Sequence, residues 1–250
     1  MTPVARHSAS ALLVGVLGLV FVGCGAAPGQ PGEKSIAVAP NDVVAFDALY
    51  ADNCAACHGP NGRGGAAIGL ANPLYLAIVD DRSMRASIAG GVRGTSMPAF
   101  AQRAGGMLTE KQVDAVVGGI RSRWSRPAAL AGAKPPSYAA TSAGDVDRGG
   151  VAYQTFCQSC HGPEGRGGPK GSAITNDSFL ALTSDQGLRT IVISGRPELG
   201  APGWRDYVAG RPMSDQEVTD VVSWLASHRV AAPGQPYASN RSPSGASRVD

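Results

Sequence analysis

A five-residue pattern, Cys-x-x-Cys-His, occurs twice in this chain and limits what it can fold into more than any other feature. The two copies lie at residues 54–58 and 157–161. Each thiol of such a pair can add across one vinyl group of a porphyrin, and the histidine that follows can then bind the iron as its proximal ligand. The pattern predicts two covalently bound haem c groups, attached through Cys54, Cys57, His58, Cys157, Cys160 and His161.

Two other uses of these cysteines have to be weighed. Together the four would suffice for a zinc site, and each pair alone has the spacing of a thioredoxin-like dithiol. Zinc leaves the histidine after each pair unexplained, and nothing around either pair has the βαβ pattern of a thioredoxin. Cys24 is the fifth cysteine, so no thiols are left for a disulfide framework. Haem attachment accounts for both cysteines and the histidine of each motif.

The start of the chain has the pattern of an export signal. A basic beginning precedes an apolar run over residues 9–22, which is short for a membrane span and suits a signal peptide. The run leads into residues 21–24, Phe-Val-Gly-Cys, which resemble a bacterial lipobox although Phe21 stands where leucine is usual. We expect residues 1–23 to be a signal peptide and Cys24 to be lipidated. An ordinary signal peptide or an uncleaved anchor are the alternatives.

Each of these alternatives places the body of the protein on the periplasmic side of a bacterial membrane. A lipid on Cys24 would tether it there, although firm anchoring takes more than one acyl chain. The formal net charge of +3 is far from the dense basic surface of a nucleic-acid binder. We therefore expect redox proteins and a membrane as partners, and no nucleic acid.

The similarity between the two halves extends beyond the haem motif. Residues 57–65 and 160–168 differ at a single position, where Glu164 replaces an asparagine. Further along, residues 88–90 match residues 193–195, each with the pattern Ile-x-Gly. The chain is therefore one unit written twice.

Each unit closes with a predicted helix. Its start is a capping box, at residues 109–112 in the first half and 214–217 in the second. Valines follow at helical spacing in both halves: Val113, Val116 and Val117, then Val218, Val221 and Val222.

Composition suggests where the units begin and end. We expect haem domains over residues 41–126 and 145–230, separated by a linker at 127–144 that is rich in Ala, Pro, Gly and Ser. Residues 24–40 are predicted to be a flexible tether and residues 231–250 a disordered tail. Each domain is small and poor in aromatic residues, so we expect the inserted haem to supply much of its apolar core.

Each half resembles a class I cytochrome c domain, and the whole chain resembles tandem dihaem cytochromes c. It is also similar in layout to the dihaem c-type subunit of some terminal oxidases. The resemblance covers residues 42–126 and 145–229. It implies an all-α fold in which an N-terminal helix runs into the haem motif, one or two short helices follow, and a C-terminal helix crosses the first.

The sixth iron ligand of the first haem is predicted from residues 94–100, Gly-Thr-Ser-Met-Pro-Ala-Phe. This segment resembles the stretch that supplies the distal methionine in class I domains. A lone methionine is usually core filler, but the proline and aromatic that follow favour Met97 as a ligand. A thioether favours ferrous iron, so ligation by His58 and Met97 predicts a high reduction potential.

The second half lacks this methionine. Its corresponding segment, residues 200–204, reads Gly-Ala-Pro-Gly-Trp and puts Ala201 where the ligand is expected. Three possibilities stay open: coordination by Met213, coordination by His228 if the last helix folded back, or an iron that is five-coordinate or binds water or a small molecule. We favour the third, because Met213 precedes the capping box at the position of Leu108 and suits a core residue.

Three polar side chains are candidates for smaller roles. Arg63 and Arg166 follow the two motifs at the same offset and would suit haem propionates. If the carboxylate of Asp177 accepted the free N–H of His161, in place of a backbone carbonyl, the potential of that haem would fall.

One-electron transfer is the function that these features favour, either as a freestanding carrier or as the cytochrome subunit of an oxidoreductase, with no catalysis by the chain itself. An open site on the second haem would instead suit a ligand sensor or a peroxidase-like enzyme, with Arg196, Glu198 and Arg205 near enough in sequence to be considered. An adaptor whose second haem domain is only structural is a third class.

Overall fold

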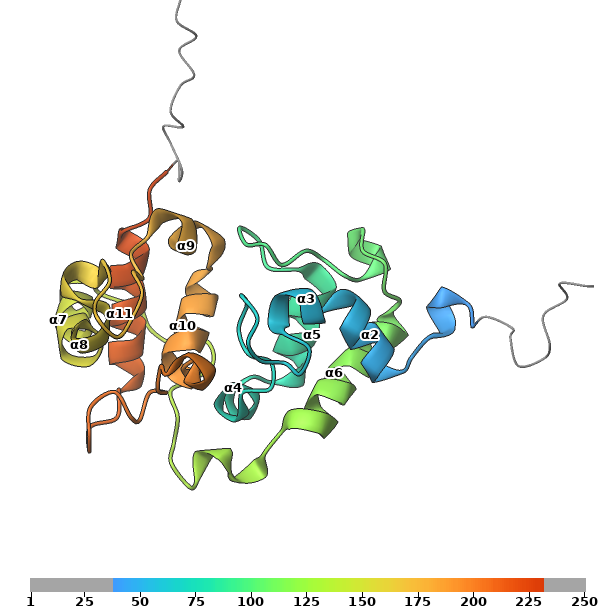
Figure 1. The fold of residues 1–250 in the computed structure, drawn as a ribbon, viewed down its shortest axis with the longest axis horizontal. Coiled ribbons are helices and arrows are strands. Elements are labelled where there is room, and N and C mark those ends of the chain that lie inside the picture. Colours follow the sequence, from blue (N-terminus) through green and yellow to red (C-terminus); the bar gives the residue numbers. More distant parts are fainter. Residues whose placement is uncertain (1–37, 232–250) are drawn as a thin grey trace, which may run out of the picture. The chain divides into compact units, whose positions relative to one another are not determined.

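The computed structural model describes residues 38–231 (Figure 1). The predicted signal peptide, the lipidation site Cys24, most of the tether and most of the predicted tail lie outside the described residues, and those expectations stay predictions. Within the described range all regular structure is helical, and backbone pairing is limited to the isolated bridges Ala101–Leu108 and Arg196–Ala201. The predicted all-α fold is confirmed.

The two predicted haem domains, called lobe 1 and lobe 2 below, repeat one order of helices. Lobe 1 contains α2 (Phe46–Asn53), α3 (Ala55–His58), α4 (Pro73–Ile78), α5 (Asp81–Gly90) and α6 (Glu110–Trp124), with the 3-10 turns η2 (Pro40–Asp42) and η3 (Gln102–Ala104). Lobe 2 contains α7 (Val146–Phe156), α8 (Gln158–His161), α9 (Asp177–Leu182), α10 (Asp185–Ser194) and α11 (Asp215–Ser227), with the 3-10 turns η5 (Pro163–Gly165) and η6 (Pro197–Leu199). Both lobes belong to one compact unit that begins at Asn41.

Both predicted capping boxes are formed. The Gln112 amide N–H donates to the Thr109 hydroxyl, and the Gln112 side chain accepts from the Thr109 backbone N–H. Ser214 and Glu217 make the same exchange at the start of α11. Each exchange satisfies two amide groups that a helix start leaves without partners. The six predicted valines are buried behind these caps.

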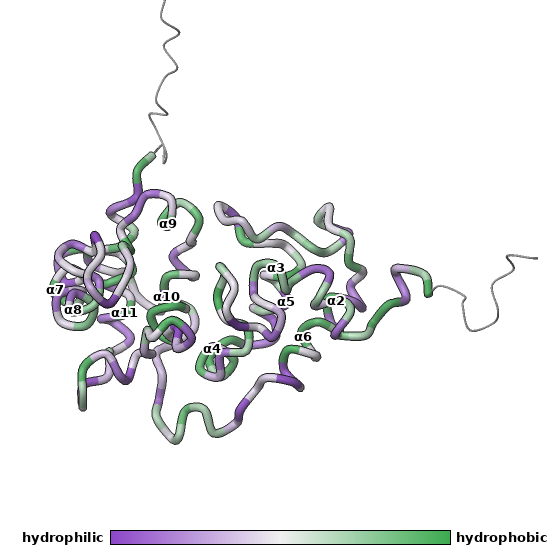
Figure 2. Tube along the Cα trace, viewed as in Figure 1, coloured by the Kyte–Doolittle hydropathy of each residue, from purple (hydrophilic) through white to green (hydrophobic). Residues whose placement is uncertain are grey.

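Hydrophobic and hydrophilic residues alternate along the helices (Figure 2), and their apolar faces form separate cores in the two lobes. None of the helices within residues 38–231 has the length and apolar character needed to cross a bilayer.

The ends of α5 and α10 correct one detail of the sequence comparison. Both helices end at a glycine with positive φ, Gly91 at 69° and Gly195 at 68°. The pairing of residues 88–90 with 193–195 is therefore wrong by one residue, because it aligned Gly90 with Gly195. Two adjacent glycines look the same in the sequence, but only Gly91, directly after the helix, has the positive φ that glycine tolerates best.

The first and last helices of each lobe cross at a glycine, and the two lobes use opposite helices for it. In lobe 1 a methyl group on Gly119 of α6 would overlap the ring of Phe46 on α2. In lobe 2 a methyl group on Gly149 of α7 would overlap Asp220 and Trp224 of α11. Aligned from the motif tyrosines and the capping boxes, Phe46 corresponds to Gly149 and Gly119 to Trp224. The bulky and small partners have changed places, so each crossing stays filled.

The linker between the lobes contains η4 (Pro127–Leu130) and then lies along lobe 2. The Ser137 amide N–H donates to Asp215 (2.7 Å), and Arg189 Nε donates to the Ser137 carbonyl (2.9 Å). The Arg189 side chain is buried and also pairs with Asp215 (2.6 Å). Asp215 therefore fixes both the linker and the first turn of α11.

Adjacent glycines in α6 provide a test of the crossing. Gly119→Ala is expected to lower the free energy of unfolding by about 1–3 kcal/mol, because the new methyl group overlaps the Phe46 ring. Gly118→Ala, whose methyl group meets nothing within 4 Å, is the matched control and is expected to raise it by about 0.5–1 kcal/mol. Denaturant titration of the haem-loaded protein measures both. Equal effects of the two substitutions would contradict the packing described.

Candidate haem sites

Each haem motif lies on a short helix that follows a break in the chain. Cys54 separates α2 from α3 with φ −120° and ψ −36°, and Cys157 separates α7 from α8 with nearly the same angles. The two cysteines and the histidine of each motif thus lie on one helical turn. Tyr50 and Tyr153, on the preceding helices, donate hydrogen bonds to the carbonyls of the glycines after each motif, at 2.7 and 2.5 Å. The same frame supports both motifs.

Both motif histidines are oriented for metal binding through Nε2. His58 Nδ1 lies 2.8 Å from the carbonyl oxygen of Ile68, and His161 Nδ1 lies 2.7 Å from that of Ser172. A carbonyl can only accept, so Nδ1 carries the hydrogen and the lone pair of Nε2 faces away from the loop. Asp177 begins α9 and is exposed, so the hypothesis that its carboxylate holds His161 is wrong. A backbone carbonyl holds the ring in both lobes.

The first cysteine of each motif packs against an apolar core, and His58 is buried. Burial lowers the pKa of His58, which is 8% exposed, below its ordinary value. Burial, with a smaller effect of the second motif cysteine, raises the pKa of Cys54 to about 11 and that of Cys157 to about 12.

The four-cysteine zinc alternative finds no support in the geometry. Within the described part of the chain, no three His, Cys, Asp or Glu side chains come together in a group that could hold a metal ion. The two cysteine pairs belong to separate clusters, with Cys54 against the core of lobe 1 and Cys157 against that of lobe 2.

The structure brings Met97 to the core that Cys54 and Ile68 also contact. The Met97 carbonyl accepts a hydrogen bond from Val92 (3.0 Å), and its amide N–H donates to the Thr95 hydroxyl (3.2 Å). These bonds fix a short loop immediately after α5. The half-buried thioether thus lies in the same cluster as the cysteine and the loop that orients His58.

In lobe 2, Ala201 is the structural counterpart of Met97. The Arg196 amide N–H donates to the Ala201 carbonyl (2.9 Å), just as that of Val92 donates to Met97 in lobe 1. The loop has the same length in both lobes and differs in the side chain that it presents. The sequence comparison identified this position correctly.

Met213 corresponds to Leu108. Its amide N–H donates to the carbonyl of Trp204 (2.9 Å), and that of Leu108 donates to the carbonyl of Phe100 (2.7 Å). The Met213 side chain is 2% exposed and packs within the lobe 2 core, as Leu108 does in lobe 1. The geometry favours a core role for Met213.

His228 lies at the end of α11 and interacts with its own helix. Its Nδ1 is 2.8 Å from the Trp224 carbonyl, and its ring packs edge-on against the Trp224 indole with centroids 4.4 Å apart. This position is the one that the simpler interpretation of a helix-terminal histidine predicts.

One buried donor in lobe 2 has no partner, and sequence reasoning did not identify it. Trp204 is 5% exposed, and its indole Nε1 makes no hydrogen bond within the described residues. An unpaired buried N–H costs about 1–3 kcal/mol. It packs in the cluster that contains Cys157, where a polar group of a haem, or of a molecule bound to its iron, would satisfy it. With the two thiols and the oriented imidazole, these residues fit a haem.

The two candidate propionate partners behave differently. Arg63 Nη2 donates to the Ala71 carbonyl (3.2 Å), whereas Arg166 is exposed and pairs with Glu164 (3.0 Å). Their equal sequence offset therefore does not give them equal surroundings.

Comparison with known proteins decides the family. Residues 41–118 and 144–225 match the family model "Cytochrome C oxidase, cbb3-type, subunit III". Together these segments make up more than half of the chain. The chain belongs to this family. As a member with two complete attachment motifs, it is a dihaem cytochrome c of electron transfer that carries two haem c groups.

Individual relatives match this chain at limited identity and over part of their length. The cbb3-type cytochrome c oxidase subunit CcoP of Azospirillum sp. (strain B510) is 31% identical over 129 residues, a match covering 47% of this chain and 38% of that protein. Among solved structures, a reducing HAO-like protein complex of Kuenenia stuttgartiensis is 20% identical, with 74% of this chain and 96% of that chain covered and a TM-score of 0.45. A thiosulfate dehydrogenase from Marichromatium purpuratum is 18% identical, with 79% and 48% covered and a TM-score of 0.30.

Removing one cysteine pair tests the attachment residues. Replacing Cys54 and Cys57 by alanine is expected to remove one covalently bound haem, because only thioethers make the cofactor part of the chain. Replacing Cys157 and Cys160 is expected to remove the other, and replacing all four to leave none. Intact-mass spectrometry after expression with cytochrome maturation factors counts the haems. A double variant that kept two haems would contradict the assignment.

Proposed function

We propose that this protein carries single electrons between redox partners on the periplasmic side of a bacterial membrane, with no reaction catalysed by the chain itself. Haem 1, attached at residues 54–58, is the high-potential site. Haem 2, attached at residues 157–161, has the lower potential and an iron open on its distal side. The observation that carries this proposal is the matched pair of distal loops, one presenting Met97 and the other Ala201.

Haem c supplies one-electron chemistry when bound, and the chain determines how readily each iron is reduced. His58 and His161 are held alike by backbone carbonyls, so the proximal sides contribute similarly to the two potentials. Met97 adds a soft thioether that favours ferrous iron, and Ala201 offers no donor atom. The difference in potential between the sites then comes chiefly from the distal loops.

A peroxidase-like role receives little support from the candidate distal groups. Arg196 pairs with Glu198 and donates to the Gly65 carbonyl of lobe 1. Arg205 donates to the carbonyls of Leu130 (2.9 Å) and Ala129 in the linker. Each of these side chains is committed to other partners. A ligand sensor is the second candidate, favoured by the absence of a donor atom at Ala201.

The anchoring and the complex in which the protein works are part of the same proposal. Lipidation of Cys24 would hold the protein at the membrane surface, where its partners are reached by lateral diffusion. The relative from Azospirillum is an oxidase subunit, which supports a role as the cytochrome component of a respiratory complex. The match covers 38% of that protein.

Met97→Ala is expected to lower the reduction potential of one haem sharply and leave the other unchanged, because the substitution removes the ligand that stabilises ferrous iron. Spectroelectrochemical titration of the haem-loaded protein measures both midpoints. Met107→Ala is the matched control, since Met107 is 75% exposed and lies outside the core. Two unchanged midpoints in Met97→Ala would exclude Met97 as a ligand.

Carbon monoxide tests the open site on haem 2. Reduced protein is expected to show a CO-induced spectral change that amounts to half of its haem. Ala201→Met is expected to abolish that change and raise the lower potential, because it restores a thioether at the counterpart of Met97. Ala209→Met, at an exposed position of the same segment, is the control. If the parent protein gave no CO response, another side chain would close the site.

A further inference from the structure

A lobe 2 arginine lies against the haem motif of lobe 1. Arg196 follows the glycine that ends α10, and its Nη2 donates to the carbonyl of Gly65 (2.8 Å). Its side chain is 13% exposed. Gly65 in turn packs directly on the motif, since a methyl group there would overlap the Cys57 carbonyl. A fixed positive charge from lobe 2 is therefore placed beside the turn that presents His58.

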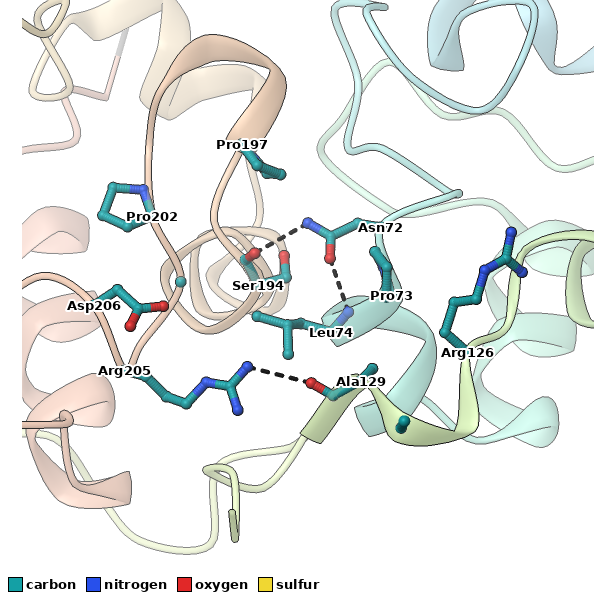
Figure 3. Close-up of a pocket in the computed structure, with 12 residues that line it drawn as sticks. Asn72, Pro73, Leu74, Arg126, Ala129, Ser194, Pro197, Pro202, Arg205 and Asp206 are labelled. Carbon is teal, nitrogen blue, oxygen red and sulfur yellow. Dashed lines mark hydrogen bonds between the residues drawn. The ribbon is translucent and has the colours of Figure 1, made fainter. Parts of the chain in front are cut away.

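Asn72 holds the end of α10, where Ser194 lies two residues before Arg196 (Figure 3). Asn72, which is buried, donates through Nδ2 to the carbonyls of Ser194 (3.0 Å) and Gly195 (3.3 Å). Its Oδ1 accepts from the Leu74 amide N–H and caps α4, so one side chain joins the start of α4 to the end of α10. On the far side of the same cavity of about 500 Å³, Arg205 binds the linker carbonyls. Asn72 thus holds the backbone just before Arg196, while the Arg196 side chain is held by the Gly65 carbonyl and by Glu198.

Its counterion lies against the same loop. Glu198 pairs with Arg196 at 2.5 Å and is 18% exposed. Its carboxylate is 3.8 Å from the Cβ position of Gly69, next to Ile68, whose carbonyl holds His58. The pair therefore presents two opposite charges to the proximal loop of haem 1, the cation at Gly65 and the anion at Gly69.

The arrangement acts in one direction. Val92 occupies the position of Arg196 in lobe 1, so the charged contact has no counterpart at that position.

We propose that Arg196 is a positioning residue of lobe 2 that raises the reduction potential of haem 1, while Glu198 opposes it. The inference rests on the proposed electron-carrier function and adds a coupling between its two lobes. One electron passes from one iron to the other, ferrous becoming ferric at the donor and ferric becoming ferrous at the acceptor. A nearby fixed cation favours the acceptor that has gained negative charge, and partial burial limits screening by solvent.

Spectroelectrochemical titration of the intact dihaem protein tests the proposal. Arg196→Gln is expected to lower the midpoint of haem 1, identified as the wave that Met97→Ala moves, and to leave haem 2 unchanged. The equilibrium constant for electron transfer from haem 2 to haem 1 should fall by about threefold or more. Glu198→Gln is expected to move the same midpoint upward. Arg196→Lys, which keeps the charge, is expected to restore most of the wild-type value.

Arg205→Gln is the matched control, because it removes one positive charge from the same junction without touching residues 65–69. The proposal is overturned if Arg196→Gln leaves both midpoints unchanged, or if Arg205→Gln lowers haem 1 equally, since the effect would then come from the junction as a whole. A wild-type protein without two reversible one-electron waves would instead refute the proposed function itself.

Discussion

The hydrogen bond from each motif histidine to a backbone carbonyl is the interaction on which both lobes depend. It fixes the ring and leaves the lone pair of Nε2 available to a metal. It also requires the loop after the motif to have the same conformation in both lobes. The glycines that follow each motif and the tyrosine hydroxyls that bind their carbonyls hold that loop. The terminal helices, crossing behind the motif, hold the tyrosines. Each layer of the lobe thus supports the orientation of one imidazole.

Outside the segments that hold the motif histidines, the two lobes differ in the loops that follow α5 and α10. The distal loops keep their length and their closing hydrogen bond, yet one presents a thioether and the other a methyl group. The same loop of lobe 2 carries Arg196 and Glu198 toward lobe 1. The two lobes therefore have the same attachment motif, and only the loop of lobe 2 presents an arginine and a glutamate to the other lobe at these positions.

Much of this architecture could be predicted from the sequence because the signals are local. Haem motifs, capping boxes and valine spacing each lie within a few residues, and the counterpart of Met97 follows from a proline and an aromatic beside it. The contact of Arg196 with Gly65 joins residues far apart in the chain, so no local sequence pattern predicts it. The sequence could not distinguish the Asp177 carboxylate from a backbone carbonyl as the partner of His161, because that choice depends on the conformation of the loop. The pairing of Gly90 with Gly195 failed because conformation, not identity, distinguishes neighbouring glycines.

The exchange of large and small residues at the two helix crossings affects which helices can pair while the duplicated chain folds. If α2 paired with α11 during folding, Phe46 would meet Trp224, bulk against bulk. If α7 paired with α6, Gly149 would face Gly119 and leave a void. Only the native pairings match large with small. The side-chain sizes at the two crossings therefore disfavour misassembly between the tandem domains, which is a characteristic hazard of repeated sequences.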